Sequence, residues 1–108
     1  MIAVIAVIVM AQAQPGLISY DQAVRCAGLT QAASELEGGE SARGRELSDA
    51  ALYWSLAAGQ AAMAGGREQT AEADQTRARV TAVRELSNGV AGAREQLNRC
   101  LARTPDLG

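Results

Sequence analysis

The chain has 108 residues, of which 48% are hydrophobic, and its ten basic and twelve acidic residues give a net charge of −2. A chain of this length forms one domain at most, and its mild charge, with no basic patch carrying interleaved aromatic residues, argues against a nucleic-acid-binding role. The sequence has no His and only two Cys, so the usual ligands of zinc, haem and dinuclear iron sites are missing. We therefore expect neither a metal nor a cofactor.

The first thirteen residues are typical of a secretory signal peptide. Ile2–Ala11 is an uninterrupted apolar run that is too short to span a bilayer. Ala11 and Ala13 supply the small side chains that signal peptidase accommodates, so we predict cleavage after Ala13, with Gln14 first in the mature chain and residues 14–18 as an irregular lead-in. No Lys or Arg precedes the apolar run, and a retained membrane anchor or a buried N-terminal helix stays open as an alternative.

The rest of the chain is predicted to be entirely α-helical. Its apolar residues recur at steps of three and four, and β-branched residues are scarce, which disfavours strands. Ser19 followed by Gln22 fits a capping box, so a first helix is expected to begin there and to end at Gly38-Gly39. The buried stripe of this helix is predicted to consist of Tyr20, Ala23, Val24, Ala27 and Leu36.

A second helix is predicted over residues 42–64, and a third begins near Arg67. The apolar steps continue through Asn88-Gly89, so residues 67–102 form either one overlong helix or two helices separated there. We favour a break, with Asn88 capping a fourth helix.

Residues 19–103 are therefore expected to form a small antiparallel bundle of three or four helices. Thr104-Pro105 ends the last helix, because the residue before a proline is biased away from the helical conformation. Residues 104–108 are predicted to be a C-terminal tail.

The two cysteines lie in the first and the last predicted helix, at Cys26 and Cys100. An even number of Cys in an exported chain indicates a disulfide. A helix that returns after a break near residue 88 would bring Cys100 towards Cys26. Free thiols or an intermolecular bridge are the alternatives. We expect no redox role, because the chain has no C-x-x-C motif and no His.

The centre of the second helix offers a candidate interface. Small residues recur at four-residue intervals beside Trp54, and such a surface lets another helix approach closely. Packing within the chain, with Trp54 as a core anchor, is the first interpretation, and a homodimer contact is the alternative. The candidate residues are Ala51, Trp54, Ser55, Ala58, Gly59 and Ala62.

Two groups of acidic residues match no metal-binding motif. Glu35, Glu37 and Glu40 are interpreted as a solvated turn, and Glu68, Glu72 and Asp74 suit the positive end of a helix. No general base suited to neutral pH and no phosphate-binding loop can be identified, so we do not expect an enzyme.

The chain resembles small exported helical proteins of alphaproteobacteria in the order of three features. These are Cys26, the segment Tyr53-Trp54-x-Leu56, and Cys100. Those proteins have a Cys in the first helix, a Tyr/Trp pair with small residues in the middle and a Cys near the end. The resemblance implies a helical fold and an exported location, and it implies no activity. The architecture is also similar to that of the acid-stress periplasmic chaperones, small helical proteins with one disulfide.

We therefore expect a periplasmic or secreted protein with a binding or structural role towards an unknown protein partner, possibly a second copy. A membrane-anchored accessory subunit that retains residues 1–13 is one alternative. A stress-responsive periplasmic chaperone that exposes its Ala-rich second helix is the other.

Overall fold

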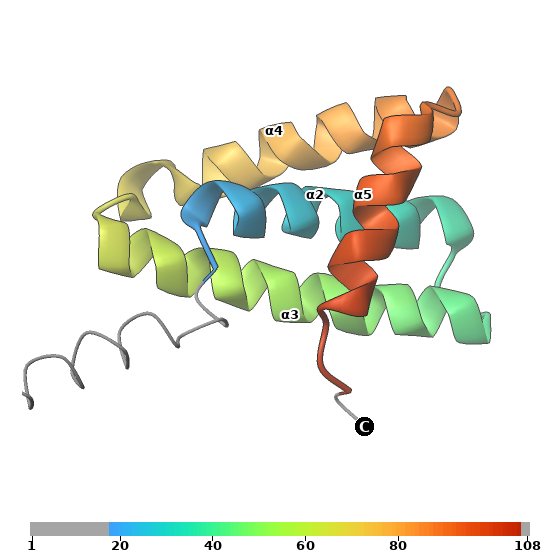
Figure 1. The fold of residues 1–108 in the computed structure, drawn as a ribbon, viewed down its shortest axis with the longest axis horizontal. Coiled ribbons are helices and arrows are strands. Elements are labelled where there is room, and N and C mark those ends of the chain that lie inside the picture. The colour runs from blue at the N-terminus through green and yellow to red at the C-terminus, as the bar shows by residue number, and fades with distance from the viewer. Residues whose placement is uncertain (1–17, 107–108) are drawn as a thin grey trace, which may run out of the picture.

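The computed structural model describes residues 18–106, which form four helices (Figure 1). These helices are α2 (Tyr20–Glu37), α3 (Ala42–Gly65), α4 (Glu68–Ser87) and α5 (Ala91–Ala102). The described part of the chain contains no strand, and the predicted all-α bundle is confirmed. The predicted signal peptide, its cleavage site and residues 14–17 of the lead-in lie outside the described residues.

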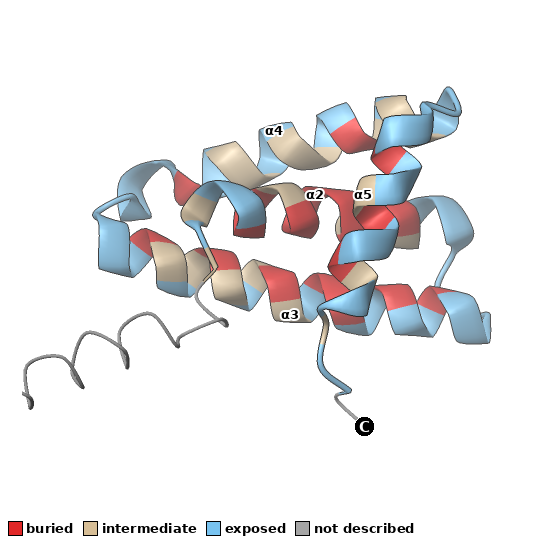
Figure 2. Cartoon of the chain, viewed as in Figure 1, coloured by how far each residue is buried: buried red, intermediate tan, exposed pale blue. Residues whose placement is uncertain are grey.

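Helix α2 is the centre of the bundle. It lies between α3 and α4, and α5 crosses it at a steep angle (Figure 1). Since α2 contacts all three other helices, nine of its 18 residues are buried (Figure 2). The largest fully buried side chains of the described core are Trp54, Leu29, Leu47 and Thr30. Most other core residues are Ala, so the helices pack through short side chains.

The ends of α2 and α3 follow from their capping residues. The Ser19 Oγ accepts a hydrogen bond from the Gln22 backbone N–H at 3.1 Å, which confirms the predicted start of α2. The same contact recurs in α3, where the Ser41 Oγ accepts from the Gly44 N–H at 2.9 Å. Gly66 follows α3 with φ 73°, a left-handed conformation that glycine adopts without the steric cost of a Cβ.

The predicted break between the last two helices is confirmed, but its capping residue is different. Gly89 turns the chain at φ 71°, and the N-cap position of α5 is Val90, which makes no side-chain capping bond. Asn88 instead closes α4, because its backbone N–H donates to the Arg84 carbonyl at 3.1 Å. The left-handed residue has to follow α4 before the chain can turn, so the next helix begins later than Asn88.

The predicted buried stripe of α2 is wrong at one residue, Leu36. Ala23, Val24 and Ala27 are buried and Tyr20 is half-buried, whereas Leu36 is 52% exposed. Leu36 lies in the last turn of α2, where the neighbouring helices no longer cover it.

Helices α2 and α4 approach each other closely at Gly28. A Cβ atom placed on Gly28 would lie 2.6 Å from the Ala78 carbonyl carbon, which is backbone and cannot turn aside. Gly28 thus sets the spacing of the two helices, in the way that small residues generally permit close helix contacts.

We expect Gly28→Ala to lower the free energy of unfolding by about 1–3 kcal/mol, because the added methyl group has to push α4 away from α2. Urea denaturation followed by circular dichroism measures the change. Gly92→Ala is the matched control, since no atom lies within 4 Å of a Cβ at Gly92, and its effect should stay within about 1 kcal/mol. Equal stability of the two variants would contradict the close contact.

Candidate functional site

Cys26 of α2 and Cys100 of α5 form a disulfide, with their Cα atoms 5.6 Å apart. Both residues are only 4% exposed, so the bond belongs to the core. The predicted pairing is confirmed, and the crossing of α5 over α2 after the break at Gly89 is what brings the two residues together. The disulfide ties the last helix to the central one across most of the chain.

Arg25 adds a polar link beside this bond. Its Nε and Nη2 atoms donate to the Gln96 Oε1 of α5 at 2.8 and 2.6 Å, and its Nη1 lies 2.9 Å from the Glu85 Oε1 of α4. One side chain of α2 therefore holds α4 and α5 together. Because all three groups of the guanidinium are engaged, Arg25 is fixed in place and acts as a structural residue.

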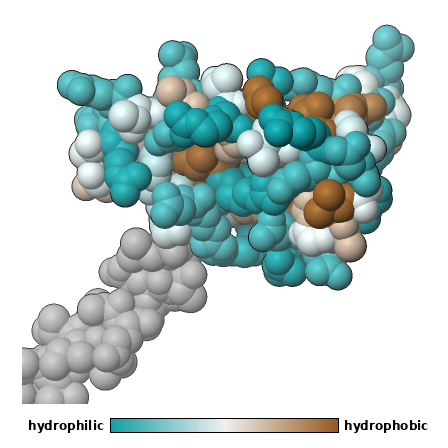
Figure 3. Space-filling view, turned by 90° about the horizontal axis from the view of Figure 1, so that it is seen from above, coloured by the Kyte–Doolittle hydropathy of each residue, from teal (hydrophilic) through white to brown (hydrophobic). Residues whose placement is uncertain are grey.

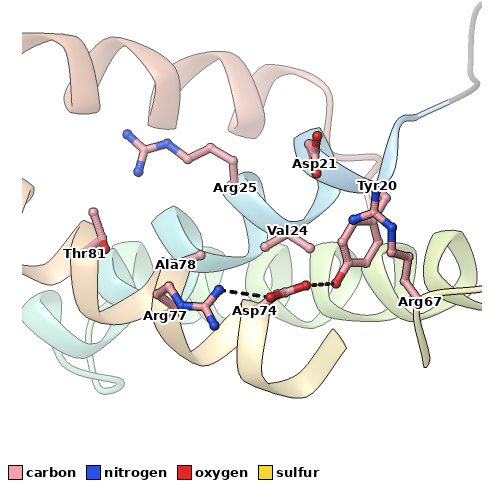
Figure 4. Close-up of a pocket in the computed structure, with 9 residues that line it drawn as sticks. All are labelled: Tyr20, Asp21, Val24, Arg25, Arg67, Asp74, Arg77, Ala78 and Thr81. Atoms are coloured by element: carbon pink, nitrogen blue, oxygen red, sulfur yellow. Dashed lines mark hydrogen bonds and ion pairs between the residues drawn. The ribbon is translucent and has the colours of Figure 1, made fainter. Parts of the chain in front are cut away.

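An open pocket of about 420 Å³ lies between the start of α2 and the middle of α4 (Figure 4). At one end of it, the Tyr20 hydroxyl donates to the Asp74 Oδ2 at 2.7 Å, and the Arg77 Nη1 donates to the Asp74 Oδ1 at 3.0 Å. The Arg67 guanidinium lies over the Tyr20 ring, 4.9 Å from its centroid, a cation–π contact. This chain of contacts closes the start of α2 against the α3–α4 turn and α4.

The contacts shift the pKa values of Tyr20 and Asp74 in opposite directions, which keep the phenol protonated and the carboxyl ionised. The hydrogen bond from Tyr20, followed by that from Arg77, lowers the pKa of Asp74 below its ordinary 3.8. Burial of the phenol, together with the neighbouring Asp74 carboxylate, raises the pKa of Tyr20 above 10.0. At neutral pH the pair is therefore a neutral phenol that donates to an ionised carboxylate, which is an arrangement that joins two helices.

We expect Tyr20→Phe to raise the pKa of Asp74 towards its ordinary value, because the variant loses the strongest hydrogen bond to the carboxylate. A folded-state pKa below the unfolded value stabilises the fold above about pH 4, and this contribution is lost as the pH falls through the folded-state pKa. Stability should consequently fall less steeply with acid in the variant than in the wild type.

A carbon-detected NMR titration of the Asp74 carboxyl measures this pKa directly. Tyr53→Phe is the control. The chain has two tyrosines, and the Asp74 carboxylate accepts its phenolic hydrogen bond from Tyr20 and not from Tyr53. If both variants moved the pKa of Asp74 equally, the Tyr20 hydrogen bond would not be its cause.

The acidic group at the end of α2 forms no shared site. Glu35 pairs with Arg79 of α4 at 3.2 Å, and Glu37 and Glu40 are exposed. Among residues 18–106 no three His, Cys, Asp or Glu side chains converge on a point that could hold a metal ion. No helix in that range is both long and apolar enough to cross a membrane.

The candidate interface of α3 is mostly occupied within the domain. Four of its six residues are buried, and they are Ala51, Trp54, Ala58 and Ala62. Ser55 accepts a hydrogen bond from the Gln31 Nε2 of α2 at 2.6 Å, and Gly59 is half-exposed. The small-residue stripe is thus mainly a contact surface between α3 and the rest of the bundle, and among its six residues Ser55 and Gly59 are partly exposed.

Comparisons with protein-family models, with curated proteins and with solved structures find no match for this chain.

A different apolar stripe of α3 is exposed, and the sequence analysis missed it. Leu52, Leu56 and Met63 are 59%, 60% and 69% exposed. The signal was present in the sequence, because these residues and Gly59 recur at steps of four, three and four, which place them on one side of a helix. By contrast, the face over α4 is mostly hydrophilic, with a few hydrophobic side chains among the polar ones (Figure 3).

Proposed function

We propose that this protein is a small exported helical protein of the periplasm or the extracellular space, and that it has a non-catalytic binding or structural role towards a protein partner. The observation that carries the proposal is the buried Cys26–Cys100 disulfide. Disulfides form and persist in oxidising compartments and are rare in the cytosol, where thiols are kept reduced.

Two further features support the proposal. The apolar segment with small residues at positions 11 and 13 has the length and the cleavage pattern of a signal peptide. Tyr20 and Asp74 of the pocket and the side chain of Arg25 are engaged in contacts between helices, so their present roles are structural. The row of exposed apolar side chains on α3 is instead typical of an interaction surface.

The test is to produce the full chain with a C-terminal tag in a bacterial host that has a general secretion pathway. Cell fractions are analysed by N-terminal sequencing and by mass spectrometry without reduction. We expect exported protein that begins at Gln14 and contains a Cys26–Cys100 peptide. Ala13→Tyr is the matched control, because a bulky side chain at the cleavage position should leave the segment attached.

Two results would overturn the proposal. An intact Met1 on wild-type protein in the membrane fraction would favour the membrane-anchored subunit. Two alkylatable thiols in exported protein would remove the disulfide from the argument. A chaperone role would need the Ala-rich face of α3 to open, since that face is buried in the core.

A further inference from the structure

The outward face of α3 carries no charge along most of the helix. No Asp, Glu, Lys or Arg lies between Asp49 and Arg67, although the helix lies at the edge of the bundle. A helix without a charged face is normally covered on all sides. The core covers only one side of α3, and the other side leaves Leu52, Leu56 and Met63 more than half exposed.

The exposed residues form one straight stripe. Leu52, Leu56, Gly59 and Met63 follow the spacing with which helices pair in coiled coils. The stripe is about 17 Å long, given the rise of an α-helix. Gly59 is a gap in it, because no atom lies within 4 Å of a Cβ at this position. The stripe therefore presents three projecting side chains and one hollow.

We propose that this stripe binds the same stripe of a second copy of the chain, with the two α3 helices antiparallel. When Leu56 of each copy lies opposite Gly59 of the other, Leu52 of each copy also lies opposite Met63 of the other. The projecting Leu56 side chains then fill the hollows at Gly59. Such a self-complementary contact is what a twofold-symmetric dimer requires.

The parallel arrangement of the same two helices fits less well. It would place Gly59 opposite Gly59, which leaves a void, and Asp49 opposite Asp49, which repels. The antiparallel arrangement instead keeps the two Asp49 side chains at opposite ends of the contact, so like charges are kept apart. Both packing and charge thus favour the antiparallel pair.

The extent of the stripe sets the expected strength of the dimer. A stable protein interface buries about 800 Å² per partner, and weak, transient interfaces bury less than about 600 Å² per partner. Three exposed side chains with their neighbours offer a contact of the smaller kind. We therefore expect a reversible dimer with a dissociation constant in the micromolar range. The inference names a partner for the proposed binding role, but it does not depend on export.

The experiment is sedimentation velocity of the oxidised full-chain protein over a range of concentrations, with three variants. Leu56→Glu should weaken dimerisation at least about tenfold, because it places a charge at the centre of the contact. Leu36→Glu is the matched control, since Leu36 is 52% exposed on α2 and lies off the stripe. It should leave the dissociation constant unchanged.

Gly59→Leu tests the register itself. The substitution meets no atom within its own chain, so the monomer should stay folded by circular dichroism, while the hollow for the partner's Leu56 is filled. We expect a monomer. Stronger association of this variant would show unspecific apolar contact and would overturn the antiparallel register.

A wild-type protein that stays monomeric at all concentrations would overturn the whole inference. If wild-type protein from the export test began at Gln14 and carried the disulfide, the proposed function would still stand. The two ideas can therefore fail separately.

Discussion

Replacement of both cysteines, as Cys26→Ala with Cys100→Ala, is expected to lower the free energy of unfolding by about 4 kcal/mol. The bond joins residues 74 positions apart, so it removes many conformations from the unfolded chain. The loss is large for this protein because its core is thin. Alanines make up most of the buried apolar residues, and small domains are stable by only about 5–15 kcal/mol.

Urea denaturation of the oxidised wild type and of the double variant measures the difference. Wild-type protein in a strong thiol reductant is the control, and it should unfold near the midpoint of the variant. If the variant and the oxidised wild type unfolded at the same urea concentration, the bond would not stabilise the fold. If reduction destabilised the protein much less than the double substitution, loss of side-chain packing at the two positions would be the cause.

Local chemistry determined the parts of the fold that were predicted correctly. Ser19 and Gly38 lie at the two ends of α2, Gly66 follows α3, and Gly89 lies at the break between α4 and α5. Each of these residues acts on the backbone beside it, so its effect can be identified from neighbouring positions alone. The disulfide was also predicted, because the chain has only two Cys and the break permits the last helix to return.

The faces of α3 could not be assigned in the same way. A helix usually shows its outer side through charged residues, and α3 has none between Asp49 and Arg67. The small-residue face is predicted to pack within the chain, with a homodimer contact as the alternative, and the outer apolar stripe is not singled out. The first of these interpretations is confirmed. The structure buries the small-residue face, because alanines let α3 lie close to α2, and leaves the larger Leu52, Leu56 and Met63 outside.

The polar links between helices could not be predicted for a different reason. Tyr20 and Asp74 are 54 positions apart, and Arg25 and Gln96 are 71 apart. No local pattern connects such residues, since their contact depends on how the helices cross. The same holds for Thr104, which is predicted to lie in the C-terminal tail but accepts a hydrogen bond from the buried Trp54.

Trp54→Ala is expected to lower the free energy of unfolding by about 3–5 kcal/mol. Trp54 is fully buried, and its ring meets that of Tyr53 edge to face with the centroids 5.1 Å apart. The surrounding side chains are mostly short, so they cannot move in to fill the cavity that the indole would leave. Circular dichroism in urea is the suitable measurement, because the variant lacks the only Trp of the chain.

Part of the loss of stability in Trp54→Ala is expected to come from a hydrogen bond between Trp54 and Thr104, which follows α5. The Trp54 Nε1 donates to the Thr104 Oγ1 at 2.8 Å, and the same hydroxyl donates to the Cys100 carbonyl at 2.8 Å. Thr104→Val keeps the shape of the side chain but leaves the buried indole N–H without a partner, which should cost about 1–3 kcal/mol. Trp54→Phe removes the donor as well, so Thr104→Val should have less effect in the Trp54→Phe background than in the wild type. Equal effects in the two backgrounds would show that Thr104 acts through α5 alone. The residues after α5 would then contribute nothing to the anchoring of Trp54.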